Sequence, residues 1–397
     1  MWRLGFFFHE MAFGLLSVFI PLYIVTPEIG GSLVDIGIMT SVALLSAIPA
    51  SFFWGYICDK TRRYKFYILL SFISIAILLY LFTLATSITV FMVLYIMMAM
   101  LHVAHEAPKN VLIAEHYSRE EWSKSYALYE GLTEIGWILG LLMGLLAASV
   151  TLSANYTLLL CSGLNLIAFV LSIFLVADPL LIFERRLVSI EKKIDYTYRG
   201  LGTASRLLDG LPLREKLKGD SFLAFGAGLV LFSLASSLFF TPLPIFFSQE
   251  LTIPASMIFM IYMLNSGGAL VGYFFSGRRA MSPDAKTHMR RIMLLRSVLV
   301  LSLVTVVQFA VSPTLLAAVI LVSMGFAYAF YHILTLSLSM ELIPAGRAGL
   351  FDVLVSLGAA FGSFLGPLIA QMMGFLLQFL VASAFFFLAY LTLKILS

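Results

Sequence analysis

Charge is scarce in this chain. Only 12% of its 397 residues are Asp, Glu, Lys or Arg, whereas 61% are hydrophobic, and the mean hydropathy is +1.01. This composition excludes a soluble globular protein. About twelve apolar runs follow one another, and a run of roughly 20 residues crosses the hydrocarbon core of a bilayer as a helix. We therefore expect an all-α integral membrane protein. Its spans are expected at residues 4–25, 34–57, 66–86, 88–112, 125–148, 155–177, 221–247, 255–276, 292–311, 314–338, 349–370 and 374–394.

Cysteine and catalytic motifs are also scarce. The only two cysteines, Cys58 and Cys161, fall in or at the end of different spans, which argues against a disulfide framework. There is no phosphate-binding glycine loop and no Ser/His/Asp arrangement at useful spacing. We therefore expect neither an enzyme nor a bound cofactor. The first run keeps His9 and Glu10 and lacks a small-residue cleavage site, so it is expected to be a retained span.

Lysine and arginine are missing from every second break between the runs. The breaks near 26–33, 85–87, 149–154, 248–254, 312–313 and 371–373 contain none of the 25 basic residues. Because basic loops stay on the cytoplasmic side, both termini are expected in the cytoplasm, in a plasma membrane. Only Lys109 and Arg296 are expected inside helices, both near the cytoplasmic end, which leaves no arginine near the midplane. The net charge of +4 then indicates attraction to anionic lipid rather than to nucleic acid.

The chain divides into two halves that repeat each other. We expect an N-terminal bundle of six helices over residues 1–177, a cytoplasmic linker over 178–220 and a C-terminal bundle over 221–397. The linker is either amphipathic and membrane-bound or a solvated connection. Repeated features occur in the same order in both halves: Pro21-Leu22 and Pro242-Leu243, Gly55-Tyr56 and Gly272-Tyr273, and Glu115, Gly136 and Gly140 with Glu341, Gly362 and Gly366. Such duplication is typical of transporters.

Several of these motifs resemble those of the major facilitator superfamily. Residues 55–65, with Gly55, Asp59, Lys60, Arg63 and Lys65, resemble its loop 2–3 signature, although Arg62 stands where the family has glycine. Residues 341–349, with Glu341 and Arg347, and the glycines Gly358, Gly362 and Gly366 resemble its loop 10–11 and span 11. Gly136, Gly140 and Gly144 approximate the span 5 glycine motif of drug/proton antiporters, with Leu141 in place of a proline. The arginine common in span 4 is absent.

The resemblance implies a secondary transporter whose two bundles rock about a midplane site. It implies that Asp59 caps span 11, while Lys60, Arg63 and Lys65 hold carboxylates such as Glu115 and Glu341 in a cytoplasmic latch; alternatively, these bases only fix topology. The glycines are expected to be packing surfaces. The expected partners are a small-molecule substrate, protons and the lipid bilayer, with the protein a monomer.

Ionisable residues inside the spans point to the mechanism because they are costly in lipid. They are His9 and Glu10 in span 1, His102, His105, Glu106 and Lys109 in span 4, Glu130 and Glu134 in span 5, His332 in span 10 and Asp352 in span 11. One interpretation is proton coupling, led by Glu10 and Glu106 with the histidines as modulators. Another is a static ion-pair network. A third is metal binding by His9, His102, His105 and Glu106, against which Lys109 on the same face counts, so no metal is expected.

The substrate and direction stay open between alternatives. A proton-coupled exporter of neutral or cationic lipophilic molecules fits the excess of embedded carboxylates. An importer or uniporter of a sugar, carboxylate or peptide is the second possibility, and a carboxylate substrate would need an arginine in the cavity. A non-transporting sensor or assembly factor is the third, which long soluble domains would favour.

Overall fold

The computed structural model describes residues 2–116, 122–178, 219–276, 285–309, 313–342 and 349–395. The described residues form helices joined by short turns. The N-terminal half contains α1 (Leu4–Ile24), α2 (Leu33–Thr61), α3 (Tyr64–Phe82), α4 (Ile88–His102), the 3₁₀-helix η1 (Val103–His105), α5 (Glu106–His116), α6 (Trp122–Ser149) and α7 (Ala154–Leu175). The C-terminal half contains α9 (Gly219–Phe240), α10 (Leu243–Ile245), the π-helix η3 (Phe246–Glu250), α11 (Ala255–Ser276), α12 (Ala285–Phe309), α13 (Pro313–Leu342), α14 (Gly349–Met373) and α15 (Phe375–Ile395).

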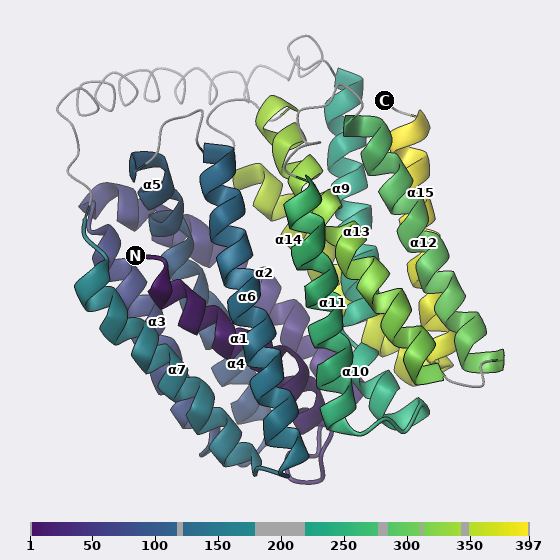
Figure 1. Cartoon of the computed structure of the whole chain (residues 1–397), viewed down its shortest axis with the longest axis horizontal. Helices are drawn as coiled ribbons and strands as arrows, with labels where there is room; N and C mark the ends of the chain where they lie inside the picture. Colours follow the sequence, from purple (N-terminus) through teal and green to yellow (C-terminus); the bar gives the residue numbers. More distant parts are fainter. Residues whose placement is uncertain are drawn as a thin grey trace, which may run out of the picture.

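The helices form two bundles with the same internal packing (Figure 1). In the first bundle α1 packs on α6 and α7, and α3 packs on α4 and α7. In the second, α9 packs on α14 and α15, and α12 packs on α13 and α15. The two bundles meet where α2 lies against α14 and α6 lies against α11. The predicted all-α membrane fold is therefore confirmed, and the described helices are arranged as two bundles.

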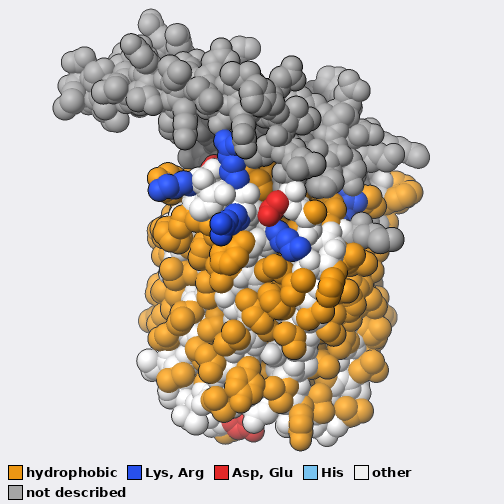
Figure 2. Space-filling view, turned by 90° about the vertical axis from the view of Figure 1, so that its left-hand side faces the viewer, with side chains coloured by type: hydrophobic (Ala, Val, Ile, Leu, Met, Phe, Trp, Pro, Cys, Tyr) orange, Lys and Arg blue, Asp and Glu red, His pale blue; other side chains and the backbone are white. Residues whose placement is uncertain are grey.

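The surface of the bundles is suited to lipid. Eleven of the described helices are long and apolar enough to cross a membrane. The remaining long helix, α12, carries Arg290, Arg291 and Arg296 but packs among the others. Figure 2 shows a broad hydrophobic band with Lys and Arg gathered at one end. We call this end the basic side. It is defined by four residues at the junction of α2 and α3: Lys60, Arg62, Arg63 and Lys65.

Prolines interrupt two of the predicted spans. Pro108 has no N–H to donate to the carbonyl of Ala104, so the helix tightens into the 3₁₀ turn Val103–His105 just before α5. Pro242 and Pro244 end α9 at Phe240 in the same way, and the chain continues through α10 and the π-helix η3. The spans expected over 88–112 and 221–247 are therefore not continuous α-helices.

The ninth span begins earlier than expected. We predicted a start at residue 292, but α12 begins at Ala285. At a rise of about 1.5 Å per residue, Arg296 lies roughly 16 Å into the helix, close to its middle. Its side chain is only 1% exposed. The predicted start of this span is therefore wrong, and Arg296 lies farther from the start of its helix than expected.

The predicted packing glycines lie at close helix crossings. A Cβ at Gly136 would lie 2.6 Å from the carbonyl oxygen of Phe7, and one at Gly140 would overlap that of Met11, so α6 touches the backbone of α1. On α14, each glycine meets a carbonyl of α9; the pairs are Gly358 with Val230, Gly362 with Leu234 and Gly366 with Leu238. Gly144 instead meets the Phe259 ring of α11, across the two bundles. Only a residue without a side chain allows such an approach.

Candidate functional site

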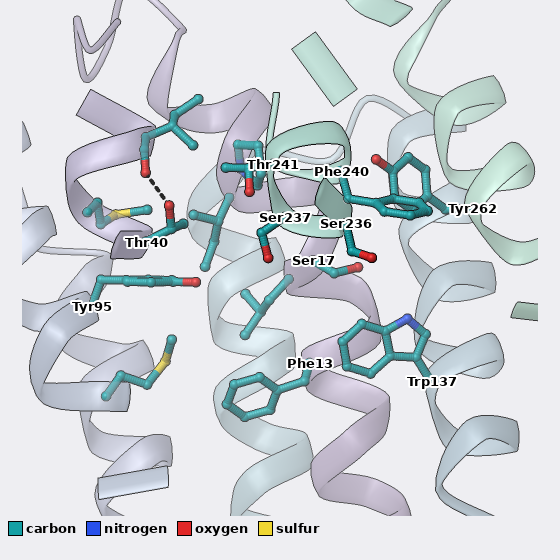
Figure 3. Close-up of a pocket in the computed structure, with 16 residues that line it drawn as sticks. Phe13, Ser17, Thr40, Tyr95, Trp137, Ser236, Ser237, Phe240, Thr241 and Tyr262 are labelled. Atoms are coloured by element: carbon teal, nitrogen blue, oxygen red, sulfur yellow. Dashed lines mark hydrogen bonds between the residues drawn. The ribbon is translucent and has the colours of Figure 1, made fainter. Parts of the chain in front are cut away.

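A cavity of about 390 Å³ lies where the two bundles meet (Figure 3). Residues of α1, α2, α4, α6, α9 and α11 line it. Its wall is mainly apolar and aromatic, with hydroxyl groups from both halves: Ser17, Thr40, Tyr95, Ser236, Ser237, Thr241 and Tyr262. In Figure 3 the hydroxyls of Ser17, Ser236 and Ser237 point into the shared space, between Tyr95 and Trp137. No charged side chain of the described residues lines it. This composition suits a small, largely apolar ligand that accepts a few hydrogen bonds.

The two bundles contact each other at the end away from the basic side. There, Gly37 of α2 packs against Pro367 and the carbonyl of Ser363 on α14, each 3.2 Å from a Cβ built at the glycine. At the start of α2, the N–H of Val34 donates to Oε1 of Gln371 at 2.9 Å. These contacts join the two bundles at one end, as an alternating-access protein requires in one of its states.

A histidine cluster lies behind the cavity wall in the N-terminal half, separated from the cavity by the Phe13 side chain. Nδ1 of His9 lies 2.7 Å from Oδ1 of Asn165, whose Nδ2 donates to the Cys161 carbonyl. Because this amide presents its oxygen, His9 carries a proton on Nδ1 and a lone pair on Nε2. That Nε2 lies 3.1 Å from Nδ1 of His102. Phe13, which lines the cavity, packs on both rings with centroids 4.8 and 4.5 Å away.

The second part of the cluster follows the 3₁₀ turn. Ser71 Oγ lies 3.2 Å from both the His102 carbonyl and Nδ1 of His105. Nε2 of His105 lies 3.3 Å from Oε1 of Glu106, while Lys109 donates to Oε2 of the same carboxylate. The Lys109 ammonium also lies 5.2 Å from the ring centroid of Tyr129. The structure thus joins four of the predicted site residues in span 4 with His9 of span 1.

The remaining predicted ionisable residues surround this cluster. Glu10 lies within electrostatic range of Glu106, Lys109, Glu130 and Glu134. Glu134 lies beside the Ser266 hydroxyl of α11, across the two bundles. In the other half, His332 hydrogen-bonds to the Tyr273 hydroxyl at 3.2 Å and Asp352 faces Glu106 and Lys109. None of these residues lines the cavity itself. They form a layer beside it, toward the basic side.

Among its described residues, the C-terminal half buries one cation, Arg296, behind the same cavity. Nη1 of Arg296 lies 3.2 Å from Oγ of Ser236, and its guanidinium carbon lies 5.0–5.6 Å from the ring centroids of Phe232, Phe240, Tyr328 and Phe386. No described carboxylate is within ion-pair distance. Ser236 and Phe240 also line the cavity. Sequence reasoning misplaced this residue because it misplaced the start of the helix.

The loop 2–3 motif makes its described contacts within the N-terminal half. Asp59 and Lys60 lie exposed in the last turn of α2, and Gly55 has no neighbour within 4 Å of a built Cβ. Lys65 Nζ donates to the Ile173 carbonyl at 2.6 Å, and Arg63 precedes α3. Arg62 adopts φ +54°, a left-handed conformation that favours glycine, which explains the family's usual residue.

The predicted latch partners lie outside what the structure describes. Arg347 is outside the described residues, as is most of the predicted linker. The backbones of Glu115 and Glu341 lie in α5 and α13, but their side chains are outside the described set. The latch therefore stays a prediction.

Two six-helix bundles around a shared internal cavity define the class of the protein as a multi-pass membrane transporter. The family model of the Major Facilitator Superfamily matches residues 4–351, and the chain belongs to that superfamily. The resemblance found in the sequence motifs is thereby confirmed. A comparison with curated proteins finds no match. The substrate must therefore be argued from the cavity.

Proposed function

We propose that this protein exports a small, lipophilic, neutral or cationic organic molecule from the cytoplasm by alternating access, coupled to protons. The observation that carries the proposal is the uncharged cavity between the bundles, with an ionisable layer beside it and contacts between α2 and α14 at the end away from the basic side. The apolar wall and converging hydroxyls favour a lipophilic molecule with few polar groups.

Proton coupling is proposed for the carboxylates of the ionisable layer. Glu10, Glu106 and Glu130 lie in electrostatic range of one cation, Lys109, and Glu134 lies in range of Glu10 and Glu130. Four carboxylates near one cation in a membrane favour proton uptake, since an excess of buried negative charge is costly. Phe13 contacts the histidine cluster and also lines the cavity, so it connects the ligand-binding space to the ionisable groups.

Orientation and location follow from the basic side. We place this side, both termini and the linker in the cytoplasm of a plasma-membrane protein, because short basic loops are retained there. The contacts between α2 and α14 then lie toward the outside. The export direction is supported by Gly136 and Gly140, which resemble the antiporter motif and hold α6 against α1.

The direct test measures proton movement in proteoliposomes. Purified protein is reconstituted with an internal pH dye, a pH gradient is imposed, and lipophilic cations and neutral aromatic compounds are added in pools. We expect substrate-dependent proton flux that is lost in Glu10→Gln or Glu106→Gln. Glu28→Gln is the matched control because Glu28 is an exposed loop carboxylate between α1 and α2.

Transport of a compound with no proton flux, unchanged in both carboxylate variants, would end the coupling proposal and leave a uniporter. The absence of movement of any compound, together with saturable binding of one, would favour a sensor.

A second candidate is transport of an organic anion, and Arg296 is the observation that favours it. This cation has no described carboxylate partner and contacts Ser236 and Phe240 of the cavity wall. A rotation of Phe240 would bring an anion within its reach. Uptake of aromatic carboxylates by wild type, lost in Arg296→Gln and partly kept in Arg296→Lys, would establish this substrate class. Equal behaviour of the two variants and wild type would exclude it.

A further inference from the structure

We propose that His9, His102 and His105 form a binding site for one divalent transition-metal cation of the Zn²⁺ or Co²⁺ type. One ring nitrogen from each lies within 4.8 Å of the other two. Imidazole nitrogen is a preferred ligand of these ions, whereas Mg²⁺ and Ca²⁺ prefer oxygen. The inference does not depend on the proposed transport, because binding is measured on the isolated protein.

The local backbone brings two of the ligands together. His102 and His105 are three residues apart, and a regular α-helix would not stack them directly. The 3₁₀ turn Val103–His105, which precedes Pro108, has three residues per turn and places them on one face. Their ring centroids lie 4.8 Å apart. The irregular turn therefore assembles the site within span 4.

The hydrogen bonds outside the cluster direct lone pairs inward. Asn165 accepts from Nδ1 of His9, which leaves Nε2 facing Nδ1 of His102 at 3.1 Å. Nitrogen ligands of tetrahedral zinc, at about 2.0–2.1 Å from the ion, lie roughly 3.3 Å from each other. Ser71 donates to the His102 carbonyl and so accepts from Nδ1 of His105. Partners of this kind hold the rings of metal-binding histidines.

One ligand atom has no hydrogen-bond partner among the described residues. Nε2 of His105 is buried in a fully buried side chain without a hydrogen bond. It lies 3.3 Å from Oε1 of Glu106, and two groups with lone pairs at this distance require a proton or a cation. Oε1 is the free oxygen of that carboxylate, because Lys109 donates to Oε2. Glu106 is not one of the three residues whose ligand atoms lie within 4.8 Å of one another, so we assign its carboxylate to the side of His105 rather than to the ion itself.

The charges around the cluster tolerate an added cation. Glu10, Glu106 and Glu130 lie in electrostatic range of Lys109, which leaves more carboxylates than cations beside the neutral histidines. The three histidines do not line the cavity, since Phe13 separates His9 and His102 from it. We therefore assign the ion as a resident one that ties α1 to α4 and η1, rather than as cargo.

The test is a titration of metal-free protein in detergent with Co²⁺. We expect one equivalent to bind with the visible absorption of four-coordinate Co²⁺, and added Zn²⁺ to displace it. His9→Ala and His102→Ala are expected to abolish the band, and Asn165→Ala to weaken binding roughly 10–100-fold. His332→Ala is the matched control, since this partly buried histidine of α13 is bonded to Tyr273 away from the cluster.

Two results would overturn the site. One is the absence of stoichiometric binding to wild type, and the other is equal binding in wild type, His9→Ala and His102→Ala. Size-exclusion chromatography confirms that each variant is folded. If His9→Ala fails this check, His102→Gln decides, because His102 is partly exposed and tolerates substitution better.

Discussion

The two halves of this transporter use different chemistry at equivalent places in the same scaffold. In the N-terminal half, histidines and a Glu106–Lys109 pair lie behind Phe13 of the cavity wall. In the C-terminal half, a single arginine held by four aromatic rings lies behind Phe240 and Ser236. One half therefore holds histidines and a carboxylate–ammonium pair, and the other holds a buried guanidinium among aromatic rings.

The two repeated halves share their backbone packing but not their side-chain chemistry. The crossing of α6 on α1 matches that of α14 on α9, and both rely on glycines against carbonyl groups. Ser71 and Phe72 of α3 and Arg296 of α12 occupy corresponding helices and face the corresponding neighbours, yet their chemistry has nothing in common. The backbone packing is shared, whereas the site is set by side chains, which is why the fold alone does not identify the substrate.

The largest expected effect tests the shared scaffold. Gly140→Leu and Gly362→Leu should each prevent stable folding, because the new side chain would meet the carbonyl of Met11 or Leu234. We expect the free energy of unfolding to fall by more than about 4 kcal/mol, a loss that single substitutions cause only through severe defects such as an overpacked core. The measurement is the yield of monodisperse protein in detergent.

Gly163→Leu and Gly267→Leu are the controls, since a Cβ at either has no neighbour within 4 Å. If one half tolerated its substitution and the other did not, the two crossings would not be equivalent.

The second prediction concerns the Glu106–Lys109 ion pair of the N-terminal half. Glu106→Gln leaves the Lys109 ammonium buried without its carboxylate. Breaking a buried pair costs about 3–5 kcal/mol, and we expect about 1–3 kcal/mol here because the Glu106 side chain is 40% exposed. The melting temperature in detergent should fall, and the double variant Glu106→Gln, Lys109→Met should recover most of the loss. A double variant as unstable as the single one would show that the pair is not the stabilising contact.

Much of this architecture was predictable from the sequence, and the errors have physical causes. The span α2 was expected at 34–57 and found at Leu33–Thr61, because an apolar run and a serine cap mark its start clearly. The start of α12 was missed because its first turns are basic, which resembles a loop although the helix extends beyond the apolar segment. That error placed Arg296 too close to the end.

The cavity residues were harder to predict than the helices. Serine and threonine are common in membrane helices, so Ser17, Ser236 and Thr241 carry no signal until the two bundles are docked. The histidine cluster did have a signal in Pro108, three residues after His105, which a search for interrupted helices would have found. The ionisable residues were identified from the sequence, but the hydrogen bonds and ion pairs between them were not.

The third prediction is a small effect at the buried charge of Arg296. Arg296→Met should change the free energy of unfolding by no more than about 1 kcal/mol, so the melting temperature should change little. The loss of cation–π contacts, worth about 0.5–2 kcal/mol, is offset by removal of an unpaired buried cation. Arg296 thus differs from Lys109, whose charge is paired. A loss above about 3 kcal/mol would indicate an acidic partner and would weaken the case for an anionic substrate.

The smallest effect concerns the contact between the halves. Gln371→Ala removes the hydrogen bond to Val34 at the closed end, and a neutral hydrogen bond contributes about 1 kcal/mol, a factor of roughly five in a two-state equilibrium. We expect the protein to open more often at that end. The measure is the labelling rate of Ser237→Cys in the cavity by an impermeant maleimide, since both native cysteines are buried.

Met372→Ala is the control for this experiment because Met372 is 72% exposed on the same helix end. A labelling rate unchanged by Gln371→Ala would mean that the Gly37–Pro367 contact alone keeps the end closed. Faster labelling in both variants would mean that the helix end itself, rather than the hydrogen bond, limits opening. Only an increase confined to Gln371→Ala assigns part of the closure to this single bond between the two halves.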